Sequence, residues 1–148
     1  MIYSHGYTDN ANYNSGLARE LASHGIIVFT LDHHDRSCPY TRKKDGTEIT
    51  IDCTDKFGSA SMVDHMVETR VDDIQRYADD ILQPGFLKEY LDFPETVQLN
   101  QDNLVLAGHS FGAVTALRTC SKDERFKCCF TYDPYLKPRK DEHESYQF

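Results

Sequence analysis

The sequence L-V-L-A-G-H-S-F-G at residues 104–112 decides the fold. Its first four residues form an apolar run, which is typical of a strand buried on both faces. A Gly-x-Ser-x-Gly turn follows, and residues 113–120 then show helical spacing. The turn is so tight that Ser110 is expected to adopt a positive φ. Gly108 and Gly112 are expected because a side chain at either position would collide with a neighbouring strand or helix.

The rest of the chain alternates between apolar runs and helical patterns, which implies a parallel sheet covered by helices. Predicted strands are residues 1–4, 26–31, 104–107 and 128–132, and predicted helices are residues 13–24, 66–82 and 113–120. Residues 38–65 are expected to form an irregular insertion, with a hairpin around residues 47–52 left open, and residues 86–100 to form a mixed connector. We therefore predict a single partial domain over residues 1–148. Its expected fold is an α/β-hydrolase-like parallel sheet with helices on both faces, incomplete at both ends.

A strand, a sharp Gly-x-Ser-x-Gly turn and a helix together form the setting of a nucleophile elbow. A serine hydroxyl is a weak nucleophile at neutral pH, so it needs a base and a group that orients the base. In the α/β-hydrolase order the acid follows the serine and the histidine follows the acid. Asp133, directly after the last predicted strand, fits the acid. The alternatives left open are an incidental serine at Ser110 and a turn aspartate before Pro134.

Two backbone N–H groups are expected to form the oxyanion hole, which stabilises the charge that develops during acyl transfer. One is the N–H of Phe111, directly after the proposed nucleophile. The other is the N–H of Tyr7 in the loop after the first strand, where Gly6 would allow a close approach. His5 precedes the serine in the chain, so it is expected to be structural rather than a base.

The histidine that would complete a triad is not assigned to any residue of this chain. His143 alone follows Asp133, in a charged stretch with no intervening strand. The other histidines all precede Asp133: His5, His24, His33, His34, His65 and His109. We therefore expect residues 1–148 to be a fragment that is nearly inactive by itself. The adjacent pair His33-His34 is not expected to bind a metal ion, because neighbouring side chains on a strand diverge.

Composition excludes several classes of partner. The net charge is −8, whereas a protein that binds nucleic acid needs clustered Lys and Arg. No apolar run approaches the ~20 residues of a membrane span. The five cysteines include no C-x-x-C pair, and we expect them to be mostly buried thiols. A reducing compartment such as the cytoplasm is thereby favoured, and secretion remains open if an N-terminal region precedes Met1.

Several segments, taken in order, resemble the platelet-activating factor acetylhydrolases of the plasma and type II intracellular group. They are residues 4–6, 21–28, 32–37 (D-H-H-D-R-S), 108–112 and 123–128, followed by Asp133 and Pro138. The resemblance implies an α/β-hydrolase that cleaves short or oxidised sn-2 acyl groups of phospholipids without a metal or organic cofactor. It also implies Ser110 as nucleophile, Asp133 as triad acid, and Tyr7 and Phe111 as oxyanion donors.

Two other functions stay open at this point. One is a different esterase of the same fold that acts on soluble esters, polyesters or peptides. The other is a non-catalytic binding protein that keeps the fold and has lost its base. The expected partner is a phospholipid or small ester, and peripheral contact with a lipid surface is left open.

Overall fold

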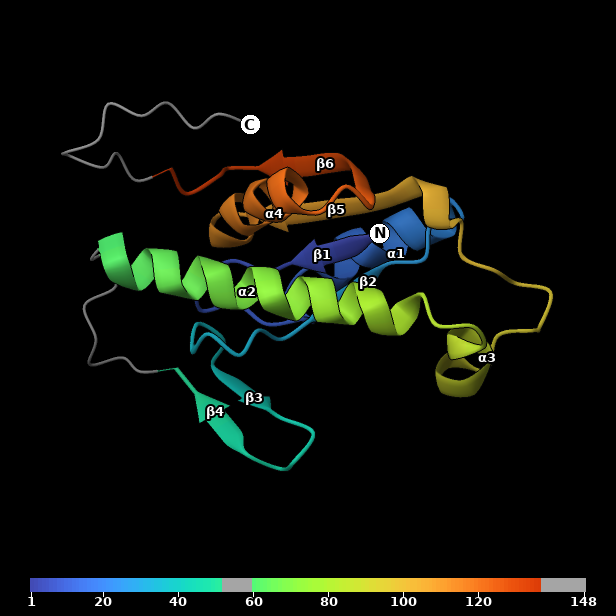
Figure 1. Ribbon diagram of the computed structural model, residues 1–148, viewed down its shortest axis with the longest axis horizontal. Coiled ribbons are helices and arrows are strands. Elements are labelled where there is room, and N and C mark those ends of the chain that lie inside the picture. Colours follow the sequence, from blue (N-terminus) through green and yellow to red (C-terminus); the bar gives the residue numbers. More distant parts are fainter. Residues whose placement is uncertain (52–59, 137–148) are drawn as a thin grey trace.

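A computed structural model describes residues 1–51 and 60–136 (Figure 1). The strands are β1 (Ile2–Ser4), β2 (Phe29–Leu31), β3 (Tyr40–Arg42), β4 (Glu48–Thr50), β5 (Leu104–His109) and β6 (Phe126–Tyr132). The helices are α1 (Ser15–Ser23), α2 (Ala60–Ile81), α3 (Phe86–Leu91), the short 3-10 helix η1 (Gln101–Asn103) and α4 (Phe111–Lys122). No described helix is long and apolar enough to cross a membrane.

Four parallel strands form the main sheet in the order β2-β1-β5-β6. Their carboxyl ends meet at one edge, because Ser4 pairs with Gly108 and His109 pairs with Tyr132. Ligands of open parallel sheets bind outside this edge. The predicted parallel sheet and its α/β-hydrolase-like order of elements are confirmed. A separate antiparallel hairpin is formed by β3 and β4.

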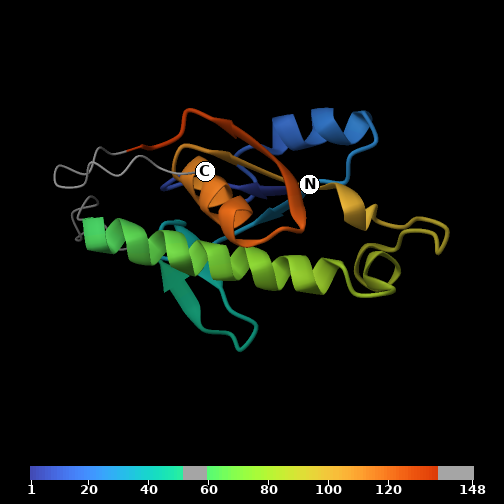
Figure 2. The same ribbon diagram turned by 45° about the horizontal axis from the view of Figure 1, so that its top comes forward.

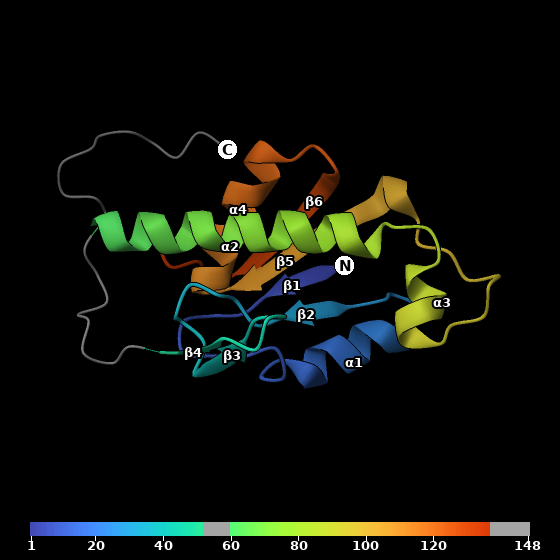
Figure 3. The ribbon, with the colours of Figure 1, turned by 60° about the horizontal axis from the view of Figure 1, so that its bottom comes forward.

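Helices cover both faces of the sheet: α1 lies on one face and α2 on the other (Figures 2 and 3). Helix α4 packs against α2 as well as β5 and β6, so these two helices share a face. The main core lies beneath them, where removal of apolar surface from water is the chief favourable term. Its buried residues are Ile2, Phe29, Ile74, Ala78, Ile81, Leu87, Leu104, Leu106, Ala116 and Phe126.

Three parts of the structure lie in segments for which the sequence predicted no helix and no definite strand: the start of α2, the β3–β4 hairpin and α3. Helix α2 begins at Ala60, six residues before the predicted start at Met66. The expected irregular insertion contains the β3–β4 hairpin, whose turn includes Gly46 at φ 89°. A short helix, α3, lies inside the predicted connector and packs Leu87 into the core.

The outer strand β6 is more exposed than the sequence indicated. It starts at Phe126 rather than at residue 128, and it is an edge strand of the described sheet. Cys128 is exposed and Cys129 is only half-buried, so the expectation of mostly buried cysteines is wrong here. Of the described cysteines only Cys38 is fully buried, and Cys53 lies outside the described residues.

Buried polar side chains join α2 to the ends of β1 and β2. His33 Nε2 lies 2.8 Å from Ser4 Oγ, and His33 Nδ1 lies 3.5 Å from Asp73 Oδ2. Burial, with the nearby Arg70 as a second cause, lowers the pKa of His33 to about 3. The ring is therefore neutral near pH 7, so its contact with Asp73 is not an ion pair. Among the described residues, His33 Nδ1 is buried without a hydrogen-bond partner.

Gly112→Ala is predicted to destabilise the protein strongly, because a Cβ there would lie closer to the carbonyl oxygen of Ser4 than atoms can approach. We expect a loss of about 3 kcal/mol or more in the free energy of unfolding. Gly16→Ala is the matched control: Gly16 is also the second residue of its helix, and a Cβ there would meet no atom within 4 Å. It should gain about 0.5–1 kcal/mol. Urea denaturation measures both, and equal effects would contradict the prediction.

Acid is predicted to destabilise the fold from about pH 6.5 downward. The unfolded chain binds a proton at His33 near its ordinary pKa, whereas the folded chain does so only near pH 3. The free energy of unfolding should therefore fall by about 1.4 kcal/mol per pH unit on account of His33. His33→Gln should remove this part of the slope, measured by urea denaturation between about pH 4.5 and about pH 6.5. His24→Gln at the exposed end of α1 is the control, and an unchanged slope in His33→Gln would refute the assignment.

Candidate active site

Ser110 sits at the turn between β5 and α4 with φ 52° and ψ −114°. The positive φ agrees with the expectation from the Gly-x-Ser-x-Gly turn, and such a conformation persists only when its surroundings hold it. Its N–H donates to Tyr132 O at 3.3 Å, and its carbonyl accepts from Tyr135 N–H at 3.1 Å. The strained serine is thus held by the last residue of the neighbouring strand β6 and by the chain that follows it.

The two glycines of the turn are required by close backbone packing. A Cβ on Gly108 would overlap the backbone of Gly112, and one on Gly112 would overlap the carbonyl of Ser4. The turn therefore brings α4 directly against β5 and the end of β1. As a result the side chain of Ser110 lies at the N-terminus of α4, where the helix dipole favours negative charge.

Asp133 directly follows β6, so it stands at the same sheet edge as Ser110. It is exposed and has a φ of 47°. The hydrogen bonds from Ser110 to Tyr132 and from Tyr135 to Ser110 bracket it in the chain. The structure thereby brings the two predicted residues to adjacent loops.

Tyr7 and Phe111 also come together. Tyr7 lies in the loop after β1, and β1 is the neighbour of β5 on the side opposite β6. Their rings meet edge to face with centroids 6.4 Å apart. The loop that carries the Tyr7 N–H therefore lies beside the first residue of α4, which carries the Phe111 N–H.

His5 is completely buried and has structural contacts. Its Nδ1 lies 2.7 Å from Gly6 O, so Nδ1 carries the proton, and its Nε2 accepts from His33 N–H at 3.4 Å. Burial lowers the pKa of His5, with a further lowering by Arg70. These contacts agree with the expectation of a structural residue.

Arg70 is the residue at this edge that the sequence reasoning missed. It is fully buried on α2 and donates to Asp35, Ser37 and the backbone carbonyls of His5 and Gly6. The available signal was its position within the apolar stripe of α2, between Val67 and Ile74. A charge on a core-facing stripe indicates a buried partner, because an unpaired buried charge is very costly.

The other histidines named below make contacts with residues other than Ser110. His109 stacks on Tyr132 with centroids 4.8 Å apart, and its Nδ1 lies 3.8 Å from Asp9 Oδ2. His34 contacts Asp73, and His143 lies outside the described residues. Over residues 1–51 and 60–136, the hydrogen bonds of Ser110 run through its backbone. The described part of the chain therefore does not pair a histidine with the serine hydroxyl.

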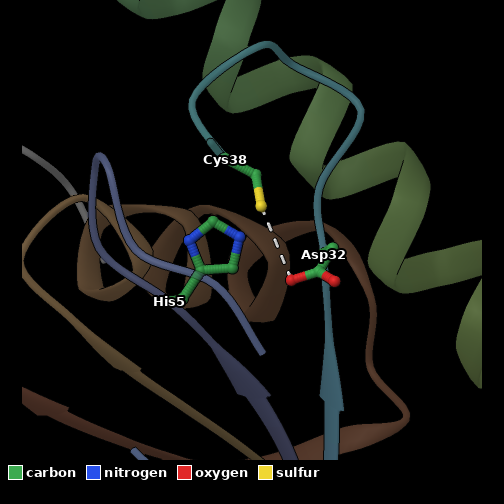
Figure 4. Close-up of side chains that lie close together, drawn as sticks. All are labelled: His5, Asp32 and Cys38. Carbon is green, nitrogen blue, oxygen red and sulfur yellow. Dashed lines mark hydrogen bonds between the residues drawn. The ribbon is translucent and has the colours of Figure 1, made fainter. Parts of the chain in front are cut away.

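One group of side chains could offer three ligand atoms to a metal ion: His5, Asp32 and Cys38, with these atoms within 4.8 Å of one another (Figure 4). The same atoms already have partners. Cys38 Sγ lies 3.2 Å from Tyr40 O and 3.6 Å from Asp32 Oδ1, and Asp32 Oδ1 accepts from Ala11 N–H at 2.6 Å. Burial raises the pKa of Cys38 to about 11, so the thiol is protonated and the group is satisfied as a hydrogen-bonded cluster.

Comparison with known proteins gives consistent results. The family described as platelet-activating factor acetylhydrolase, isoform II, matches residues 1–147. The chain is 27% identical to the dog (Canis lupus familiaris) platelet-activating factor acetylhydrolase over 95% of this chain and 36% of that protein. It is 25% identical to the chicken (Gallus gallus) protein of the same name over 96% of this chain and 40% of that protein. The chain thus spans little more than a third of the length of these relatives.

A solved structure supports the fold. A ferulic acid esterase from Streptomyces cinnamoneus superposes with a TM-score of 0.65 at 22% identity, covering 84% of this chain and 33% of that one. At this identity the likeness shows the α/β-hydrolase fold alone. The family match spans both the turn at Ser110 and the buried loops around Arg70. This chain belongs to the platelet-activating factor acetylhydrolase isoform II family.

Proposed function

We propose that this protein is a serine esterase that removes short or oxidised sn-2 acyl groups from phospholipids. The observation that carries the proposal is Ser110, held at φ 52° in a strand–turn–helix at the carboxyl edge of a parallel sheet. The family membership favours a phospholipid ester as the substrate class. Asp133 and the loop of Tyr7 lie at the same edge.

The proposed reaction begins when Ser110 Oγ adds to the ester carbonyl carbon and its proton passes to a base. The N–H groups of Tyr7 and Phe111 stabilise the negative oxygen that results. Collapse expels the protonated lysophospholipid alcohol and leaves an acyl-serine, which water then cleaves to a free acid. Asp133 orients the base. No histidine of residues 1–148 is assigned to that base, so inactivity of the isolated chain stays a prediction.

A pocket beside Tyr7 supports a small acyl group. Its volume is about 210 Å³, and its lining combines Met62 and Met66 with charged or polar groups. The remaining lining residues are Tyr7, His34, Asp35, Arg36, His65 and Thr69. Pockets for drug-sized ligands are larger, at ~300–1,000 Å³. A short acyl chain fits this size, and the Arg36 guanidinium suits a phosphate.

Ser110 is predicted to be the residue labelled by a fluorophosphonate, which reacts with activated serines. The full-length natural protein should label once, and Ser110→Ala should abolish both labelling and ester hydrolysis. Ser121→Ala is the control, because the hydroxyl of Ser121 donates a hydrogen bond to Arg118 O within the same helix. Mass spectrometry locates the label. A folded protein without label would instead support the non-catalytic binding protein.

A panel of esters tests the substrate class on the same protein. Hydrolysis of acetyl and oxidised sn-2 phospholipids in preference to long-chain ones is the expected result. Preference for soluble esters without a phosphate would favour the other esterase that the fold allows.

Asp133→Asn is predicted to lower kcat by about 10⁴-fold, because an amide cannot stabilise the charged base that forms during the reaction. Asp92→Asn is the matched control: Asp92 is also an exposed aspartate with a positive φ, 52°, at the end of α3. Asn tolerates this conformation, so both variants should fold. Steady-state kinetics on the full-length protein compare kcat of the two variants with that of the wild type. Equal kcat values for Asp133→Asn and wild type would assign Asp133 to a turn role only.

A further inference from the structure

We propose that Arg70 is a positioning residue that sets the direction of the two oxyanion N–H groups. This inference rests on the proposed esterase function of Ser110. It concerns a residue on α2 that contacts the loop carrying Tyr7 as well as Phe111. Arg70 touches no reacting atom, and its effect passes through the backbone it holds.

All three nitrogens of the Arg70 guanidinium donate hydrogen bonds. Nε donates to Asp35 Oδ2 at 2.6 Å, and Nη1 donates to His5 O at 2.6 Å. Nη2 donates to Ser37 Oγ and, at 3.4 Å, to Gly6 O. A planar fork with several fixed donors imposes one geometry on its partners, which a lysine ammonium cannot do. The two consecutive carbonyls of His5 and Gly6 are therefore held by one rigid group.

The carbonyl of Gly6 belongs to the same peptide unit as the N–H of Tyr7. It also receives the His5 Nδ1 proton at 2.7 Å, so two donors from different side chains hold it. A peptide unit is planar and trans, so its N–H points opposite to its C=O. Holding Gly6 O thereby aims the Tyr7 N–H to the other side. A charged donor on the carbonyl also polarises the peptide and strengthens its N–H as a donor.

The same guanidinium reaches the second oxyanion donor. The Arg70 carbon Cζ lies 4.5 Å from the centre of the Phe111 ring, which is a cation–π contact. Phe111 is fully buried and begins α4, so its ring position and its backbone N–H move together. One side chain thus couples the loop after β1 to the start of α4.

Stability alone is a weak reason for this arrangement. Replacing a buried ion pair by apolar side chains of similar volume is often neutral or stabilising. Beside Arg70 the buried stripe of α2 holds Val67, Val71 and Ile74, and the largely buried Asp73 is the other charged side chain on this side. What an apolar side chain cannot supply is a set of directed donors to His5 O and Gly6 O. Directed positioning accounts for the choice of arginine.

The test uses two variants of the full-length protein, Arg70→Lys and Arg70→Met, assayed with an sn-2 acetyl phospholipid. We expect kcat to fall about 10- to 100-fold, because misplacement of a catalytic group by ~1 Å costs about this much. KM should change by less than about threefold, since the N–H groups act on the transition state. In the test, Ser110 Oγ adds to the carbonyl carbon of a trifluoromethyl ketone analogue, its proton passes to the base, and the ketone oxygen becomes a tetrahedral oxyanion. Its Ki should rise by the same factor as kcat falls.

Arg118→Met is the matched control, because it removes an arginine that also bridges α2 and α4, through Glu68, at an exposed position. It should leave kcat and Ki at wild-type values. If Arg70→Met does not fold, Arg70→Lys decides, since it keeps a charge beside Asp35 and loses the fork. A folded Arg70 variant with wild-type kcat, or with a lowered kcat and an unchanged Ki, overturns the inference. Failure of the wild type to label at Ser110 overturns the proposed function, and the inference with it.

Discussion

The ion pair between Arg70 and Asp35 is the interaction on which the arrangement of this sheet edge depends. Both side chains are fully shielded from solvent. Burial by itself raises the pKa of Asp35, but the Arg70 charge, the His33 ring and the hydrogen bonds that Asp35 accepts together outweigh burial, so the pKa is lowered. A buried charge of this kind requires every remaining donor to find a partner. Those partners are backbone and side-chain oxygens in the loops after β1 and β2. The hydrogen bonds that Arg70 donates to them therefore hold both loops against α2.

Backbone pairing in the sheet and backbone packing at the turn of Ser110 determine the positions of the other candidate site residues. Parallel pairing places the ends of β1, β5 and β6 in line, and each end supplies one candidate group. The glycines at 108 and 112 allow backbone to pack on backbone where a methyl group would not fit. Strain at Ser110 is offset by hydrogen bonds to the chain around Asp133. The backbone therefore determines where Ser110, Asp133 and the Tyr7 loop lie.

The sequence revealed features that depend on near neighbours. The elbow was predictable because its glycines, strand and helix are contiguous, and the positive φ of Ser110 follows from that local crowding. The role of Arg70 was not predictable, because its partner Asp35 lies 35 positions away in the chain and its carbonyl partners lie 64 and 65 positions away. The exposure of Cys128 was also misjudged, since an apolar run in sequence does not show whether its strand is central or at an edge.

For the proposed esterase reaction, the described residues supply one part of the chemistry and not the other. His5 and His33 are neutral and buried, and their rings hydrogen-bond to Gly6 O and Ser4 Oγ. We therefore infer that they hold loops and do not transfer protons. A general base must reach the serine proton and titrate near the working pH, and neither ring meets these conditions. In the proposed mechanism, this region supplies the electrostatic part: the N-terminus of α4, the N–H groups of Tyr7 and Phe111, and Arg70, which we propose positions them. In serine hydrolases this part retains about 10³–10⁴-fold catalysis when a triad member is lost. In the proposed mechanism, the groups that stabilise the oxyanion are therefore separate from the group that acts as the base.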